Sequence, residues 1–326
     1  MWGNRLGWVL SACLVALVAK PLWIASQAPR PSAPSGVFPE LMSRIALPAD
    51  AKSVAPGVMG EPCDSGDVYR QAIHEYEANR RAYDKYFANP RSAQAEKPKA
   101  VELLVEASRC ADMTLFAKTP SELLNYRPET PGVEAMEKLG RMANQIGLLY
   151  RLDKKPQEAR RYFEAMFALG HHLFSERAAW IEFTAGVNLM ADAARGLAKV
   201  EADENNSERA KSLEHFADAI DQYKLKQFEL YKVVSTIDSY TVGRHGGDIL
   251  ALARSSPEPM WRGEAILALG RMKFNTPRRG DQLAATREVQ QWANDPNPGV
   301  RAAANAASAL TLPQYRAMRV AGVDAP

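Results

Sequence analysis

Along the chain after Asp64, apolar side chains recur every three or four residues and alternate with charged and polar groups. This spacing gathers the apolar side chains on one face of an α-helix, because a helix turns once per about 3.6 residues. No run alternates strictly enough to indicate a β-strand. We therefore expect antiparallel helix pairs, with helices bounded by Pro, Asp, Asn or Ser over residues 68–87, 99–116, 131–152, 156–174, 175–202 and 207–239.

One of these pairs carries a more specific spacing. Gly147, Tyr150, Ala159 and Phe163 stand at intervals that resemble the tetratricopeptide repeat (TPR), over about residues 140–173. In such a repeat the small residues let two helix backbones approach, and the aromatic residues fill the space between one pair and the next. The resemblance implies TPR-like hairpins in this part of the chain.

A second pattern is duplicated near the C-terminus. The stretch Ser256–Ala268 recurs 39 residues later as Asp295–Ala307, with prolines, an apolar residue, an arginine and alanines at matching places. This period resembles HEAT repeats, in particular the short bacterial kind related to phycobilin-lyase repeats, over residues 246–312. The resemblance implies that the first residue of each copy caps a helix, that the alanines allow close stacking, and that Arg262 and Arg301 bond to adjacent turns.

The N-terminus carries an apolar stretch that favours membrane targeting. Leu6–Ala19 is uninterrupted, and the apolar character resumes after Lys20 and Pro21 as far as Ala28. A helix over 6–28 is long enough to cross a bilayer as an uncleaved signal anchor, with Lys20 reaching the interface. A cleaved signal peptide and a lipoprotein acylated at Cys13 remain alternatives. All three place the bulk of the chain outside the cytoplasm.

These patterns divide the chain into five parts. The fold expected is all-α, an α-α superhelix of TPR-like hairpins followed by HEAT-like repeats, with an N-terminal membrane-anchor helix. The parts are a signal anchor (1–28), a Pro/Ala-rich extended tether (29–63), a TPR-like helical domain (64–240), a HEAT-like repeat domain (241–320) and a tail (321–326).

Composition and motifs exclude several functions. The net charge of +3 on 326 residues lacks the basic footprint of nucleic-acid binders. His171 and His172 with Glu176 place one histidine and one carboxylate four residues apart, but no second ligand pair accompanies them, so we expect histidines on a helix surface rather than a metal site. With no P-loop, GxSxG, dinucleotide-binding or haem-attachment motif, we expect no enzyme, no cofactor and no small-molecule substrate.

Two sets of residues remain as candidates. The TPR resemblance implies that Arg141, Asn144 and Arg151 lie on the first helix of the hairpin, on the face that often lines the family's groove, so they form a candidate protein-binding surface. Cys63 and Cys110 would be free to pair in an oxidising compartment, because the second helix returns toward the start of the first; the sequence leaves a disulfide open.

The function expected is that of a protein-protein interaction adaptor or scaffold, because helical-repeat stacks present long binding faces without chemistry of their own. Its expected place is a bacterial cytoplasmic (inner) membrane, as a single-pass protein with its N-terminus inside, its soluble domain in the periplasm or extracytoplasmic space, and membrane-associated protein partners. A permanent structural subunit of a larger membrane complex is the main alternative. A lyase-like enzyme subunit is a weaker one, since no reactive Cys or His is evident.

Overall fold

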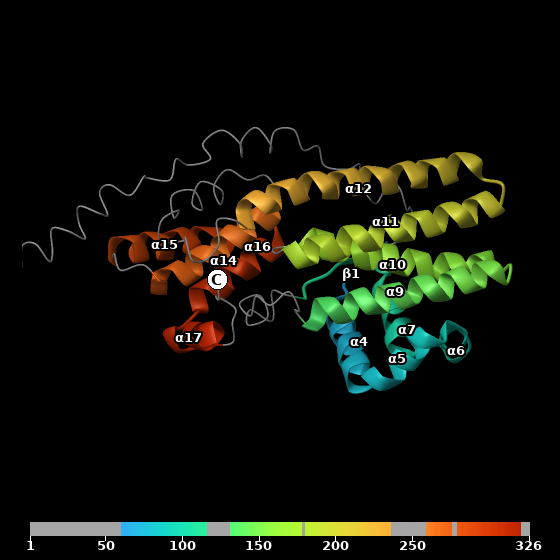
Figure 1. Ribbon diagram of the computed structural model, residues 1–326, viewed down its shortest axis with the longest axis horizontal. Coiled ribbons are helices and arrows are strands. Elements are labelled where there is room, and N and C mark those ends of the chain that lie inside the picture. Colours follow the sequence, from blue (N-terminus) through green and yellow to red (C-terminus); the bar gives the residue numbers. More distant parts are fainter. Residues whose placement is uncertain (1–59, 116–130, 178–179, 236–258, 276–278, 321–326) are drawn as a thin grey trace, which may run out of the picture. The chain divides into compact units, whose positions relative to one another are not determined.

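A computed structural model describes residues 60–115, 131–177, 180–235, 259–275 and 279–320. By backbone contacts the chain divides into Met1–Val37 and Phe38–Pro326, and every described residue belongs to the second unit. Helices dominate the described residues (Figure 1). The expectation of an all-α protein is therefore confirmed at the level of fold class.

The first described part is more broken than the sequence predicts. It consists of β1 (Glu61–Asp64), α4 (Gly66–Ala78), α5 (Arg80–Ala88), α6 (Pro90–Glu96), α7 (Lys99–Ala107) and β2 (Cys110–Asp112). The single helix expected over 68–87 is wrong, because it breaks at Asn79. The Asn79 side chain donates to the Glu75 carbonyl oxygen at 3.2 Å and to its carboxylate at 2.9 Å. Such local bonds compete with helix continuation.

The pattern predicts no β-structure, but the structure contains two short strands. The helix expected to run to Phe116 ends at Ala107 and is followed by β2, which pairs in parallel with β1. The backbone N–H of Glu61 donates to Arg109 and that of Ser65 donates to Asp112. Strands of three and four residues are too short to carry a periodic signal.

Four long helices follow, namely α9 (Pro131–Leu152), α10 (Pro156–Glu176), α11 (Trp180–Asp203) and α12 (Ser207–Ser235). Figure 1 shows them side by side in green to yellow, and successive helices run antiparallel. For α10 and α11, Phe163 contacts Gly196 near one end of the pair, and the tilted rings of Phe174 and Phe183 contact each other near the other end. These helices match the sequence prediction within a few residues, except that α11 begins at Trp180 rather than Ser175.

Small residues let these helices approach closely. A methyl group on Gly170 would lie 2.7 Å from the Met190 nitrogen and 2.8 Å from the Gly186 oxygen, so α10 and α11 touch through their backbones. Gly147 faces the ring of Phe163, whose side chain is fully buried between α9, α10 and α11. Phe163 thus fills the space between the α9–α10 pair and α11, as the TPR-like spacing predicts, while Gly147 meets its ring rather than the backbone of α10.

The last described part contains α14 (Pro259–Asn275), α15 (Arg279–Gln291), the 3₁₀-helix η3 (Trp292–Asn294), α16 (Pro298–Ala309) and α17 (Leu312–Val320). The duplicated arginines behave as the repeat pattern predicts. Arg262 binds the Asp295 carboxylate through Nε and a terminal nitrogen at 3.1 and 3.0 Å, and Arg301 donates to the carbonyls of Asp295 and Pro296. Each arginine thus bonds to an adjacent turn.

The predicted helix cap is wrong by two residues. Asn297, not Asp295, caps α16, because its side chain accepts the Val300 N–H at 3.1 Å while Pro298 occupies the first turn. Asp295 accepts the Asn297 N–H instead and binds Arg262. The first residue of the other copy, Ser256, lies outside the described residues.

The alanines of α16 form a packing surface. A methyl group on Gly270 of α14 would lie 2.5 Å from the Ala307 Cβ. Lys273 donates to the carbonyl oxygens of Ala307 and Ser308, so α14 and α16 run in the same direction. Trp261 of α14 is completely buried and donates to Gln227 of α12 at 2.8 Å, which links α14 to the longer helices.

None of the described helices has both the length and the apolar character needed to cross a membrane. The predicted anchor over 6–28, with Cys13, lies outside the described residues, as does most of the predicted tether.

Candidate functional site

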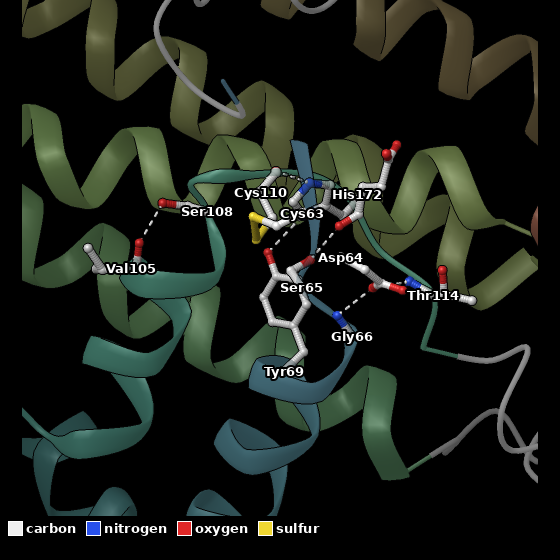
Figure 2. Close-up of a disulfide and its surroundings, with 11 residues drawn as sticks. Cys63, Asp64, Ser65, Gly66, Tyr69, Val105, Ser108, Cys110, Thr114 and His172 are labelled. Carbon is white, nitrogen blue, oxygen red and sulfur yellow. Dashed lines mark hydrogen bonds between the residues drawn. A yellow bond between two sulfur atoms is a disulfide. The ribbon is translucent and has the colours of Figure 1, made fainter. Parts of the chain in front are cut away.

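The two cysteines of the domain meet at the strand pair. Cys63 lies in β1 and Cys110 in β2, with their sulfurs 2.14 Å apart and their Cα atoms 4.8 Å apart in a disulfide (Figure 2). The bond closes a sequence separation of 47 residues. The sequence pattern predicts that Cys110 lies in the second helix, whereas it lies in strand β2. The predicted return of the chain toward the start of the first helix is present, and it brings the two cysteines together.

A buried histidine stands beside this disulfide. His172 of α10 is 1% exposed, and its Nε2 lies 3.0 Å from the Cys110 carbonyl oxygen while its Nδ1 lies 2.9 Å from the Tyr69 hydroxyl (Figure 2). Because a carbonyl only accepts, Nε2 carries the proton; Nδ1 of the neutral ring then accepts from Tyr69. His172 therefore connects α10 to both α4 and β2.

Burial controls the charge of this histidine. Removal from water lowers the pKa of His172 to about 4, and the neighbouring His171 adds to this effect. Burial also raises the pKa of Tyr69. Both groups are therefore neutral near pH 7, as their hydrogen bonds require.

This geometry corrects the expectation of surface histidines. His172 is buried and His171 half-buried, and both ring nitrogens of His172 face protein groups. Glu176 is buried as well and accepts the Leu115 N–H at 3.0 Å. No cluster of three metal-ligating side chains occurs within the described ranges. The histidine and carboxylate pair holds helices and strands together.

The three candidate protein-binding residues all lie on α9 but differ in how exposed and how tightly bonded they are. Arg141 is exposed and pairs with Glu137 of its own helix at 2.5 Å. Arg151 forms a two-point pair with Asp203 of α11, at 2.6 and 3.0 Å, and this ties down its guanidinium. Asn144 is half-buried. Of the two arginines, Arg141 is therefore the one that is accessible to a partner.

Arg141 belongs to a wider charged surface. Partial burial raises the pKa of Asp192 on α11. Arg195, Lys224 and, to the smallest extent, Arg141 act to lower this pKa. On α11, Arg195 pairs with Asp192 and, across to α12, with Asp218 and Asp221. We call this surface over three helices the charged face; its members are Glu137, Arg141, Asp192, Arg195, Asp218, Asp221 and Lys224.

Sequence patterns missed most of these partners. Tyr69 and His172 are separated by 103 residues, and Arg151 and Asp203 by 52. An isolated tyrosine or aspartate on a polar helix face gives no signal of its distant partner. The one sequence signal for this face is the spacing of charges three residues apart, Asp192 with Arg195 on α11 and Asp218, Asp221 and Lys224 on α12.

Comparison of the chain with protein-family models, with curated proteins and with solved structures finds no match. Function therefore has to be inferred from the residues and contacts of this chain.

Proposed function

We propose that the protein is a membrane-tethered, extracytoplasmic adaptor that binds a protein partner through the charged face. Support for a binding role comes from the stack of α9 to α12, whose TPR-like packing presents side chains of three helices on one surface. The observation that carries the proposal is the chain of ion pairs that runs from Asp192 and Arg195 on α11 to Asp221 and Lys224 on α12. The exposed Arg141 adds an accessible cation from α9.

The ion pairs of this face suit recognition better than stability. Exposed pairs contribute about 0–1 kcal/mol each to folding, because water and salt screen them. The side chain of Asp192 is 56% exposed and that of Arg141 is 65% exposed, so both are open to a partner. A mixed pattern of charges fixes the register of a partner and excludes surfaces with the wrong pattern.

The distribution of exposed apolar groups favours an adaptor over a permanent subunit. Obligate interfaces resemble a protein core and need a broad apolar surface. In the described part of the chain, the large exposed apolar side chains are spread over α9, α12, α15 and α17; they are Leu152, Leu225, Phe228, Leu283 and Leu312. Such scattered side chains are common on soluble surfaces.

Two features support the extracytoplasmic location. The apolar stretch over 6–28 suits a signal anchor, and the Cys63–Cys110 disulfide suits an oxidising compartment. Protease added to intact spheroplasts should degrade the domain. Protection until the inner membrane is disrupted would place the domain in the cytoplasm and contradict this part of the proposal.

The binding role is tested by reversing charges on the face. We expect Arg141→Glu to weaken partner recovery after detergent extraction by about tenfold, because it reverses the accessible positive charge that α9 contributes to the face. Folding should be little affected, since losing the pair with Glu137 and placing two acids four residues apart each cost only about 0.2–0.5 kcal/mol. Arg151 is left unchanged because its pair with Asp203 joins two helices.

Arg81→Glu is the matched control, because Arg81 is exposed on α5 and its side chain has no bonded partner among the described residues. Rising salt should release the partner from the wild-type protein. A partner that co-purifies in fixed stoichiometry, resists salt and ignores the charge reversal would instead indicate a permanent subunit.

A further inference from the structure

A polar hollow of about 240 Å³ opens between α7 and α10, and none of its lining residues belongs to the charged face. From the end of α7 it is lined by Val105, Ser108 and Arg109, and from the first half of α10 by Gln157, Arg160, Arg161 and Glu164. Its volume is below the range of about 300–1,000 Å³ that is usual for drug-sized ligands, so a matching ligand is small.

Three side chains of this hollow have no bonded partner within the described ranges. Arg109, Gln157 and Glu164 make no side-chain hydrogen bond or ion pair there. Glu164 is half-buried, and burial raises the pKa of its carboxyl. Arg160 and Arg209 act to lower this pKa without bonding to the carboxylate. Arg109 and Gln157, in contrast, are exposed to water. A half-buried carboxylate without a hydrogen-bond donor gains from a cationic group placed in the hollow.

The two other arginines are already held by acids. Arg160 donates to Glu201 at 2.5 Å and to Glu204 at 2.6 Å, both on or after α11. Arg161 donates to Glu102 of α7 at 2.5 Å. These pairs hold both guanidinium groups in place and neutralise part of their charge.

The charge balance decides which ligands fit. The wall presents three guanidinium groups, and Arg209 acts on Glu164 as a fourth cation. Glu164 and the four carboxylates within ion-pair range of Arg160 and Arg161 still outnumber these four cations by one. A multiply charged anion such as phosphate would therefore meet a net negative surrounding. A simple cation would meet the unpaired Arg109. A ligand with one charge of each sign avoids both penalties.

We propose that this hollow binds a small free amino acid as a zwitterion, with its carboxylate at Arg109 and its ammonium group at Glu164. The amide of Gln157 supplies a further donor and acceptor, and Val105 offers an apolar contact for a short side chain. This site is independent of the adaptor role, and no sequence motif indicated it.

Isothermal titration calorimetry on the purified chain tests the site with L-alanine, L-valine, L-serine and L-glutamine as probes. At least one should bind at millimolar concentration and raise the melting temperature. Acetate alone and methylammonium alone should bind at least about tenfold more weakly, because each satisfies only one of the two charges.

Arg109→Gln and Glu164→Gln should each weaken binding of that amino acid by about tenfold or more. The matched controls Arg81→Gln and Glu214→Gln remove the same charges at exposed positions outside the hollow and should bind like the wild type. Folding of every variant is checked by its melting curve.

Three results would overturn the proposal: no binding of any of the four amino acids, acetate binding as tightly as the amino acid, or equal binding by the folded Arg109 and Glu164 variants. None of these results bears on the charged face, so the two proposals fail separately.

Discussion

Removing the Cys63–Cys110 disulfide should destabilise the first described part of the chain. The double change Cys63→Ala and Cys110→Ala deletes the bond but keeps the backbone carbonyl that accepts from His172. For a sequence separation of 47 residues, loop-closure entropy gives about 4 kcal/mol of stabilisation. Since native strain and residual unfolded structure reduce this value in practice, we expect a loss of about 2–4 kcal/mol.

Urea unfolding followed by circular dichroism measures this loss. With a denaturant slope of about 2–3 kcal/mol per molar, the midpoint of the transition that includes β1 and α7 should fall by about 1–2 M. Reductant should lower the wild-type midpoint to that of the double variant and leave the variant unchanged. Cys13→Ala in all samples removes the remaining thiol.

Two results would refute this reasoning. If the wild type under oxidising conditions unfolds at the same urea concentration as the double variant, the bond does not constrain the unfolded chain. If reductant also lowers the midpoint of the double variant, the effect does not come from this disulfide.

Three further predictions concern packing and charge. Because the pKa of His172 is lowered to about 4 from an unfolded value of about 6.5, the unfolded state takes up the proton first; the wild type should lose about 3 kcal/mol as pH falls across this window. In His172→Gln that loss should be absent from unfolding curves measured between those pH values. Gly170→Ala should cost about 1–3 kcal/mol, since the new methyl meets backbone atoms of α11, whereas Gly132→Ala, with its nearest neighbour at 3.6 Å, should be neutral or slightly stabilising in the same thermal melts. Arg262→Ala should cost about 3–5 kcal/mol because it leaves the buried Asp295 carboxylate unpaired, and adding Asp295→Asn should recover part of that loss; additive losses in the double-mutant cycle would refute the coupling.

The long helices were predictable because their signals are long. In α9 to α12 the apolar spacing persists over many turns, and Pro131, Pro156 and Ser207 mark three of the starts. The TPR-like spacing also predicted that Phe163 fills the space between one helix pair and the next, and its ring lies against both α9 and α11. Repetition and length make such patterns stand out from chance.

The first described part was less predictable because its structure depends on distant contacts. β1 and β2 form where the chain returns to itself and the disulfide joins them, which no window of a few residues reveals. From its polarity alone, His172 would be expected on the surface. Only the fold brings Tyr69 and the Cys110 carbonyl to its two nitrogens. Asn297 and Asp295 are both good caps, so only geometry separates them.

The candidate site was predictable only where it depends on a single helix. The TPR resemblance indicated one helix face, and Arg141 lies exposed on it. It did not indicate that Arg151 would be tied to Asp203, or that α11 and α12 would extend the face through Arg195 and Asp221. Ion pairs between helices follow from helix packing, which a single sequence does not supply.

Site-specific photo-crosslinking in intact cells tests the central claim most directly. A photoreactive amino acid replaces Arg141 or Asp192 on the charged face, and Glu214 as an exposed position on α12 outside the set that defines this face. The adaptor role predicts that both face positions cross-link to the same protein and that Glu214 does not. Identical products from all three positions, or no product from either face position, would contradict it.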